Sequence, residues 1–253
     1  MVEYREVTDE RAWDELIEAH AGHPMQAWGW GELKARTGSW SARRIAVELG
    51  RGWQSSEQIV LPRTAAIGLA PTEDEIMAGL HSKKARQYIR KAGRSGVTVR
   101  RATAADLDAI MDIYHHTADT DDFALHSDEY YRTAFEACAD VNQVFLAEIE
   151  GRPLAFLWNI ATSGTAFELW GGVTDEGKRL RANYLLKWQA ICTAKESGSA
   201  LYDLNGLLEG GVSTFKLLFA GEPTVWMGAY DRPLSPLYRV WDAALKLYRR
   251  LFK

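Results

Sequence analysis

The chain has little of what marks unusual classes of protein. Its 253 residues include two cysteines and seven prolines, and no apolar run approaches the ~18 residues that span a bilayer. Charged residues make up 25% and hydrophobic residues 47% of the chain, as in ordinary globular proteins. This composition excludes a disordered chain, a collagen, a coiled coil and a membrane channel. Because no apolar run follows a basic start, we expect no signal peptide, a cytoplasmic location and reduced thiols at Cys138 and Cys192.

Several enzyme signatures are missing as well. Residues 172–178 have the spacing of a phosphate loop, but Arg179 stands where Ser or Thr must hold magnesium. No Gly-x-Ser-x-Gly elbow occurs and neither cysteine has a neighbouring histidine, so no nucleophile for covalent catalysis is visible. Residues 90–95 nearly match the pyrophosphate loop of acetyl-CoA enzymes, yet they end a predicted helix instead of opening one. The His and Asp residues at 115–122 follow no zinc spacing, so we expect neither a metal nor another cofactor.

Charge is distributed unevenly along the chain. The formal net charge is -4, which gives no bulk attraction to nucleic acid. No acidic residue occurs between Glu75 and Asp106, whereas the acidic stretch Asp106 to Asp140 reverses the sign. The basic residues of the first window are Lys83, Lys84, Arg86, Arg90, Lys91, Arg94, Arg100 and Arg101. Helical spacing presents several of them as a ridge, which favours an anionic ligand; a solvated helix neutralised by the acidic stretch is the open alternative.

Periodicity and turn signals predict the elements of the first part of the chain. We expect strands at 2–7 and 42–49 and helices at 10–19 and 26–37. A helix then begins at Thr72, which forms a capping box with Glu75, and ends at Gly93 and Gly96. We assign 1–71 to a first domain and 72–96 to a basic connecting helix.

The second part predicts one complete mixed α/β domain over 97–231. Its strands are expected at 96–101, 143–149, 154–162, 165–173, 200–204 and 224–230. Its helices are expected at 103–118, 127–138, 181–196 and 212–219. Glu150-Gly151 and Ser163-Gly164 are turn signals, so the three central strands should form an antiparallel meander. The first 71 residues have the same start as this domain, and they resemble an abridged copy of it.

The last segment, 232–253, predicts an amphipathic helix. Apolar residues from Leu237 to Leu251 recur at helical spacing beside Arg239, Lys246 and Arg249. Such a terminal helix usually docks on a core, and peripheral contact with an anionic membrane is the minor alternative.

Three clusters of residues are candidates for chemistry. The first is the run from Gln26 to Lys34, whose tryptophans would bury one side of a helix and leave Lys34 near the rim. The second is Lys178, Arg179 and Arg181 at a helix start, where side-chain charge adds to the helix dipole and suits a diphosphate.

The third cluster follows a buried strand. Tyr202-Asp-Leu-Asn-Gly206 precedes a glycine turn and then Phe215-Lys216. A lysine beside an aromatic ring can hold a developing oxyanion or a phosphate while the ring stacks on a base or sugar. For each cluster taken alone a structural role is the alternative, and for Trp28, Trp30, Phe215 and Phe219 core packing is the favoured interpretation.

Four strings at these positions resemble one family. They are Gln26 to Lys34, KKARQYIRKAGRSGV at 83–97, RANYLLKWQAI at 181–191, and YDLNG followed by GVSTFKLLFAG. Together, in this order, they resemble the Fem-type (FemA, FemB and FemX) peptidoglycan aminoacyltransferases, and the resemblance covers most of the chain. FemA and FemB carry a helical hairpin in the second domain that has no counterpart here, so the arrangement is closer to FemX, with an abridged first domain.

The resemblance implies tandem GNAT-like domains and transfer of an amino acid from aminoacyl-tRNA to the stem-peptide amine of a UDP-linked or lipid-linked muropeptide precursor. Carried over residue by residue, Lys34 and either Arg179 or Arg181 would hold the diphosphate, and Tyr184 and Tyr202 would line the precursor site. Phe215 and Lys216 would meet the aminoacyl end of the tRNA, with Lys216 stabilising the charge on the attacked carbonyl. The basic ridge, represented by Lys83, Lys84, Arg90 and Arg94, would bind tRNA.

Three hypotheses stay open on the sequence alone. The amino acid arrives as an activated ester, so attack by an amine needs neither ATP nor a metal, and the proton acceptor is either Asp203 or a substrate group. A CoA-dependent N-acyltransferase is the second hypothesis. The short first domain suggests a third, a non-catalytic relic of the family. The amino acid transferred and the oligomeric state are not encoded in any of these motifs.

Overall fold

The structure is a computed structural model that describes residues 4–20, 22–38, 41–47, 54–55, 61, 63–207, 211–225, 230–231, 233, 235 and 237–252. The α-helices are α1 (Glu10–Ala19), α2 (Trp28–Thr37), α3 (Glu73–Gly79), α4 (Lys83–Arg94), α5 (Leu107–Asp121), α6 (Asp128–Ala137), α7 (Asp175–Leu180), α8 (Ala182–Glu196), α9 (Gly211–Ala220) and α10 (Leu237–Phe252). The strands are β1 (Tyr4–Glu6), β2 (Ile45–Val47), β3 (Gln54–Ser55), β4 (Arg63–Gly68), β5 (Thr98–Arg101), β6 (Asn142–Ile149), β7 (Arg152–Ala161), β8 (Thr165–Val173), β9 (Leu201–Gly206), β10 (Thr224–Val225) and β11 (Tyr230–Asp231).

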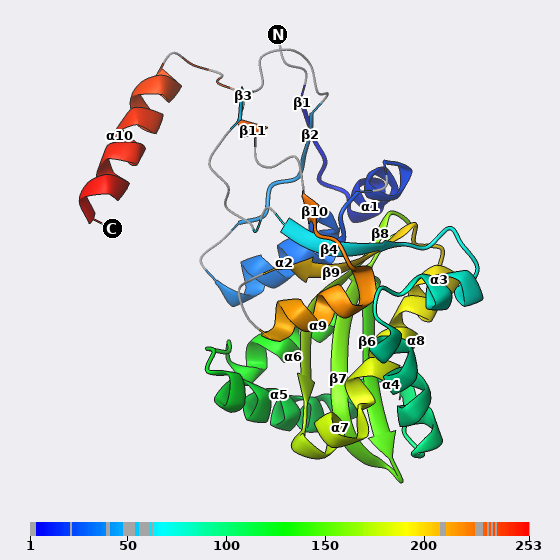
Figure 1. The fold of residues 1–253 in the computed structure, drawn as a ribbon. Coiled ribbons are helices and arrows are strands. Elements are labelled where there is room, and N and C mark those ends of the chain that lie inside the picture. The colour runs from blue at the N-terminus through cyan, green and yellow to red at the C-terminus, as the bar shows by residue number, and fades with distance from the viewer. Residues whose placement is uncertain are drawn as a thin grey trace.

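A seven-stranded mixed sheet organises the fold, in the order β10-β4-β9-β8-β7-β6-β5 (Figure 1). Neighbouring strands are antiparallel except β8 and β9, which are parallel. The predicted meander is confirmed as β6, β7 and β8. Its first turn has the expected cause, because Glu150 and Gly151 adopt φ values of 50° and 75°, which a tight hairpin turn requires.

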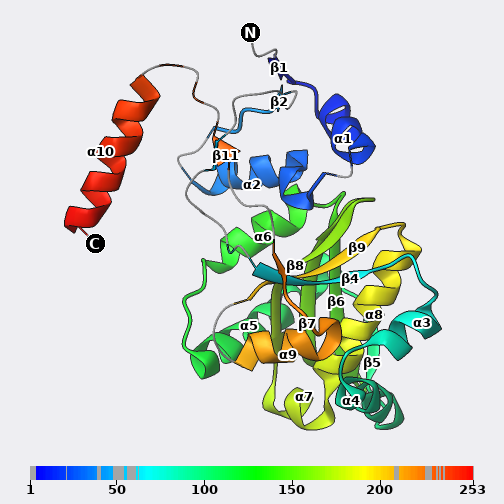
Figure 2. The same cartoon turned by 45° about the horizontal axis from the view of Figure 1, so that its top comes forward.

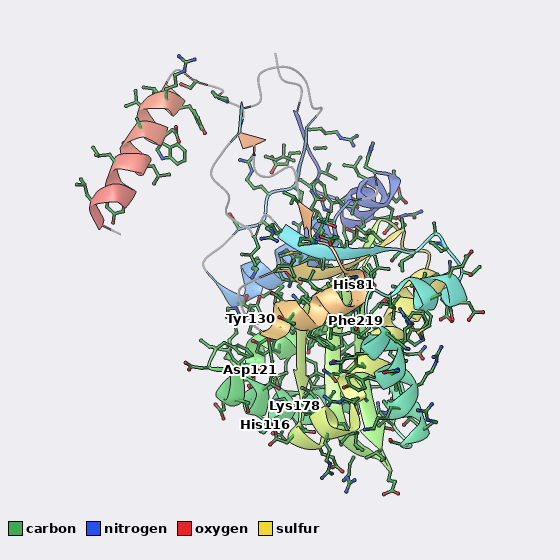
Figure 3. All side chains as sticks on the ribbon, viewed as in Figure 1. His81, His116, Asp121, Tyr130, Lys178 and Phe219 are labelled. Carbon is green, nitrogen blue, oxygen red and sulfur yellow. The ribbon has the colours of Figure 1, made fainter. Side chains whose placement is uncertain are left out.

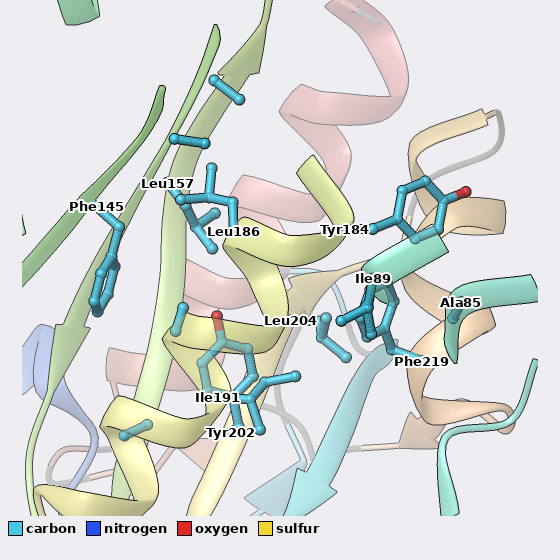
Figure 4. Packing of buried hydrophobic residues seen from close by; sticks show 14 of the residues in the cluster. Ala85, Ile89, Phe145, Leu157, Tyr184, Leu186, Ile191, Tyr202, Leu204 and Phe219 are labelled. Carbon is cyan, nitrogen blue, oxygen red and sulfur yellow. The ribbon is translucent and has the colours of Figure 1, made fainter. Parts of the chain in front are cut away.

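Helices cover the two faces of the sheet (Figure 2). Helix α5 packs on β7 and β8, whereas α8 packs on β6 and β7 from the other side. Alternation along β6 separates two cores: Val144 and Leu146 pack with α5 and α6, and Phe145 and Ala147 pack with α4 and α8. The second core includes the aromatic rings around Phe219 of α9 (Figure 4).

The N-terminal segment is a small unit joined to the body through α2. Strands β1 and β2 pair with each other, and Val7, Trp13 and Ile17 form a small apolar cluster. Helix α2 packs against α6, where Leu33 is completely buried in the α5–α6 core. The predicted elements at 10–19 and 26–37 are therefore present, the second of them beginning at Trp28 after a 3-10 turn at Pro24–Gln26.

Three features differ from the sequence predictions. Strand β4 was not predicted, and it pairs with β9 of the large sheet although it falls within 1–71. The predicted single helix from Thr72 is two helices, because Ser82 caps a new helix by accepting a hydrogen bond from the Lys84 N–H at 3.2 Å. The predicted strand 224–230 is two short strands, β10 and β11, and residues between them lie outside the described part.

The C-terminal helix α10 is present as predicted, but it stands apart from the body in both views (Figure 1). Leu237, Val240, Trp241 and Leu251 are each more than half exposed. The expected docking of this helix on a core is therefore wrong for the described residues. Within the described residues, no helix has the length and apolar character needed to cross a membrane.

Candidate functional site

Polar side chains gather where strands β8 and β9 separate. The parallel register joins residues 165–167 to residues 201–203, after which β8 runs on to Val173 beside β7. At the end of β9, Asn205 has a left-handed backbone with φ 69°. Its Nδ2 donates a hydrogen bond to the backbone oxygen of Glu168 at 2.9 Å. This bond ties the end of β9 to β8 beyond the last register pair.

A buried ion pair lies at the same point. Lys187 of α8 and Glu168 of β8 are 4% and 6% exposed, and Lys187 Nζ lies 2.6 Å from Glu168 Oε2. The hydroxyl of Tyr202 donates to Glu168 Oε1 at 2.8 Å and accepts from Asn159 Nδ2 at 3.0 Å. Buried charges persist in proteins when they are paired and hydrogen-bonded in this way. We call Asn159, Glu168, Lys187 and Tyr202 the buried network.

Lys216 on α9 lies beside the buried network. Its Nζ donates to the backbone oxygen of Gly206 at 3.0 Å. Burial lowers the pKa of Lys216 to about 8, although the nearby carboxylates of Glu168 and Asp203 act in the opposite direction. Asp203 Oδ1 accepts a hydrogen bond from the Thr64 hydroxyl of β4. The Oδ2 atom has no hydrogen-bond partner among the described residues, and burial raises the pKa of this carboxyl.

A chain of aromatic rings extends from Lys216. The ring of Phe215 lies 4.9 Å from that of Tyr184, and the Tyr184 ring lies 5.0 Å from that of Tyr88 on α4, both edge to face. The guanidinium of Arg181 lies over Tyr88 at 4.5 Å. Lys187 Nζ lies 5.3 Å from the centre of the Phe215 ring. The aromatic residue that precedes Lys216 is thus held between rings on one side and the buried ion pair on the other.

This arrangement suits the transfer of an activated acyl group. An ammonium group with a pKa near 8 is protonated at neutral pH, and it can stabilise negative charge that develops on an attacked carbonyl oxygen. The Asp203 carboxyl, with its raised pKa, is a candidate proton acceptor beside it. Both cysteines are buried free thiols, and burial raises the pKa of each to about 12, which disfavours a thiolate nucleophile.

Lys34 lies in a different part of the molecule from Lys216. Its Nζ donates to the Tyr130 hydroxyl of α6 at 2.9 Å and lies 4.9 Å from the ring centre of Trp30. Trp30 packs with the α5–α6 core, whereas Phe215 packs with the core on the other face of the sheet. Figure 3 marks the two regions by Tyr130 on α6 and Phe219 on α9. The predicted juxtaposition of Lys34 and Lys216 in one cleft is therefore not found among the described contacts.

Lys34 borders a cavity of its own, with a volume of about 480 Å³. The cavity lies between α2 and the segment before β2, and its lining residues are Gly31, Lys34, Ser41, Ala42 and Arg43. Arg43 forms an ion pair with Glu6 at 2.9 Å. Because the charge of Arg43 is paired with Glu6, Lys34 is the basic side chain of this cavity that suits an anionic group.

The two candidate arginines have different surroundings. Arg179 is exposed and lies 3.5 Å from Glu176 on the same helix, whereas Arg181 lies against Tyr88 and begins α8 with a left-handed backbone, φ 63°. Helix α7 and helix α2 lie at opposite ends of the large sheet in both views (Figures 1 and 2). One diphosphate held jointly by Lys34 and either arginine is therefore inconsistent with the structure. The predicted helix start at Arg181 is confirmed within one residue, but α7 precedes it and was not predicted.

Tyr184 and Tyr202 are both buried. Tyr202 is 0% exposed and its hydroxyl is used within the buried network, so it has no surface with which to line a precursor site. Its position supports Glu168 instead. Tyr184 is 7% exposed and contacts Phe215 directly, so it supports the ring that was predicted to meet the tRNA end.

The predicted basic ridge lies on the outer face of α4. Lys83, Lys84, Arg90 and Arg94 are exposed, and none of them has an ion-pair partner among the described residues. Ala85, Ile89 and Ala92 form the buried face of the same helix. The charges are therefore presented outward by a helix that is anchored in the core.

Sequence reasoning missed the buried network as a whole. The available signal was one charged residue inside each of two apolar runs, Glu168 in the strand TAFELWGGV and Lys187 in the helix ANYLLKWQAI. Unpaired burial of either charge would be costly, so each predicts a partner. The histidines considered as ligands contact separate acidic residues, His115 with Asp128 and His116 with Asp175, and among the described residues no group of three potential ligands gathers.

The mixed sheet with its parallel pair is an α/β fold, and the buried polar groups gather where that pair ends. A family model described as the acetyltransferase (GNAT) domain matches residues 80–217, more than half of the chain. The chain belongs to this family. No curated protein matches it in sequence.

The chain is similar to solved structures at low sequence identity. A crystal structure of FemX is 14% identical, with a TM-score of 0.80, and the match covers 95% of this chain and 100% of that one. The structure of L-PGS from Bacillus licheniformis is 14% identical over 77% of this chain and 66% of that one, with a TM-score of 0.49. The fold is therefore that of FemX over nearly the whole chain. Since the match covers 95% of this chain, most of residues 1–71 lie within it.

Proposed function

We propose that this acyltransferase moves an amino acid from aminoacyl-tRNA to the stem-peptide amine of a muropeptide precursor in the cytoplasm. The observation that carries the proposal is the Lys216 ammonium beside Phe215 at the end of β9, in a chain with the FemX fold. An aminoacyl ester is already activated, so the site has to orient the ester and stabilise the charge on its carbonyl oxygen. Lys216 supplies that charge stabilisation, and Phe215 offers a ring against which the tRNA end can stack.

The acceptor and the donor occupy separate subsites in this proposal. The cavity at Lys34 receives the diphosphate of the UDP-linked or lipid-linked precursor. An extended peptide covers roughly 3.4 Å per residue, so the diphosphate and the reacting amine of one precursor can lie far apart. The exposed ridge on α4 binds the tRNA backbone, and Arg181, which contacts Tyr88 of the same helix, lies at the donor side of the site.

A Lys34→Ala variant tests the acceptor subsite. A charged hydrogen bond to phosphate contributes roughly 1.5–3 kcal/mol, so KM for the precursor should rise about tenfold or more while kcat changes little. Arg36→Ala is the matched control, because Arg36 lies on the same helix and is paired with Glu136 at the surface. Steady-state kinetics with a UDP-linked precursor measures both. Equal effects of the two substitutions would contradict this subsite.

A reconstituted transfer assay tests the proposed function itself. The protein is incubated with charged tRNAs and UDP-linked precursor, or with acetyl-CoA and the same acceptor, and the products are identified by mass spectrometry. We expect an aminoacylated precursor only when charged tRNA is present. Acetylation without tRNA would favour the CoA-dependent alternative, which the family model also accommodates. No transfer from any donor would favour a non-catalytic relic.

Helix α10 supports a peripheral contact with an anionic membrane, where a lipid-linked acceptor would be found. Its exposed apolar residues include Val240 and Trp241, and the segment has four basic residues and one acidic residue in sequence. We expect the protein to co-sediment with vesicles that contain an anionic phospholipid. Val240→Glu should weaken this binding about tenfold, whereas Val225→Glu, at an equally exposed valine of β10, should not. Equal binding to purely zwitterionic vesicles would contradict the charge argument.

A further inference from the structure

The buried Glu168–Lys187 pair requires an explanation beyond stability. Replacing a buried ion pair by apolar residues of similar volume is often neutral or stabilising, so such a pair is weak grounds for a purely structural role. Here both residues come from apolar segments of β8 and α8. The surrounding core has Tyr202 and Leu186 completely or almost completely buried, so an aliphatic pair would have suitable neighbours.

The pair contacts Phe215 through the Lys187 side chain, and the backbone of Glu168 is linked to the residue that precedes Gly206. Lys187 Nζ lies 5.3 Å from the Phe215 ring centre and 5.8 Å from that of Phe219. The ammonium therefore faces the two aromatic rings that α9 contributes. Glu168 accepts from Lys187 through its carboxylate and from Asn205 through its backbone oxygen. Asn205 directly precedes Gly206, whose carbonyl accepts the hydrogen bond from Lys216.

Three charged groups face Lys216 from the elements packed around α9. Strand β8 presents Glu168, helix α8 presents Lys187, and strand β9 presents Asp203. Strand β4 contributes the neutral hydroxyl of Thr64, which is bonded to Asp203, and α4 contributes the Tyr88 phenol, which reaches this region through Tyr184. Burial has the largest effect and lowers the pKa of Lys216, and the Lys187 ammonium lowers it further. The carboxylates of Glu168 and Asp203 raise it.

We propose that Glu168 and Lys187 are positioning residues for the transfer reaction: the buried ion pair holds the Lys187 ammonium against the Phe215 and Phe219 rings, and so fixes the part of helix α9 that carries Lys216. The inference rests on the proposed function, because positioning Phe215 and Lys216 matters for the reaction only if these two residues act on an acyl donor. It predicts that removing the charge of Glu168 and shortening its side chain have separate effects on the reaction, the first on the pH dependence of kcat and the second on kcat itself.

The test compares pH–rate profiles of Glu168→Gln and Glu168→Asp with wild type. Activity needs protonated Lys216, so the alkaline limb of kcat should lie near its pKa of about 8. Glu168→Gln removes a carboxylate that raises this pKa, so the limb should move to lower pH. Glu168→Asp keeps the charge but shortens the side chain, so kcat should fall while the limb stays in place. If the pair had no positioning role, folded Glu168→Asp, which keeps the charge, would retain wild-type kcat.

The outcomes separate this inference from the proposed function. If wild type transfers amino acids and folded Glu168→Asp keeps wild-type kcat, the inference is overturned and the function stands. If wild type shows no transfer, the proposed function is contradicted, and the inference that rests on it falls with it. Should Glu168→Gln fail to fold by circular dichroism, Glu168→Gln/Lys187→Met leaves no unpaired buried charge and is assayed in its place. That folded double variant should lose at least tenfold in kcat, and wild-type kcat in it would overturn the inference.

Discussion

The Lys216→Ala variant should lose about 10²–10³-fold in kcat for amino-acid transfer, with a much smaller change in KM for either substrate. Lys216 lies on α9, where its ammonium donates a hydrogen bond to the Gly206 carbonyl at the end of β9 and lies beside the buried network. A group that acts mainly on charge developing in the transition state affects kcat more than ground-state binding. The measurement is steady-state transfer from charged tRNA under saturating precursor.

Lys195→Ala is the matched control for this variant. Lys195 also donates one hydrogen bond to a backbone carbonyl, that of Leu69 at 2.9 Å, so its removal costs a comparable contact in the same core. We expect the control to keep near wild-type kcat. If both variants lose activity equally, the loss at Lys216 reflects folding and the catalytic assignment fails.

Lys216→Arg tests the charge itself. An arginine stays protonated far above the pH at which Lys216, with a pKa of about 8, loses its proton. The variant should therefore retain part of the activity and lose the alkaline decline of kcat that we expect in wild type. An unchanged alkaline limb would show that the group titrating near that pH is another one.

Local signals explain why much of the fold was predictable. The Thr72–Glu75 capping box is present, with the Glu75 N–H donating to the Thr72 hydroxyl at 3.3 Å, because such a box depends only on residues three apart. The hairpin turns of the meander likewise depend on adjacent residues such as Glu150 and Gly151. Strand β4 was missed since the strands with which it pairs in the described part of the chain, β9 and β10, follow it by more than a hundred residues. Its short sequence RTAAIG also has no clear alternation.

The candidate site was predictable only in part, because some of its contacts join residues that are far apart in the chain. Phe215 and Lys216 adjoin in sequence, so their motif was visible, whereas the hydrogen bond from Thr64 to Asp203 joins residues far apart in the chain. For the same reason, the sequence did not show that Lys34 lies far from Arg179 and Arg181, with which it was predicted to share one diphosphate. Spacing along the chain says nothing of which face of the sheet a residue reaches, and α2 and α7 lie at opposite ends of that sheet.

The site and the ridge lie in one continuous part of the molecule. Helix α4 packs on both α8 and α9, and its Tyr88 contacts Tyr184, which contacts Phe215. A polyanion that follows the outer face of α4 is therefore near the elements that hold Lys216. Because of this proximity, the ridge can bring the aminoacyl-tRNA to the site. The charge of α4 can be tested by tRNA binding, separately from the transfer step at Lys216.

Arg90→Glu/Arg94→Glu should weaken tRNA binding about 10- to 100-fold at moderate salt, and the slope of log affinity against log salt should fall by about two. Both arginines are exposed on α4 without an ion-pair partner among the described residues, so their charge is available to phosphates. The control Arg11→Glu/Arg152→Glu changes the net charge equally, but at arginines paired with Glu15 and Glu176. Filter binding across a salt series measures both. Equal weakening by the two double variants would mean that net charge, and not the ridge, attracts tRNA.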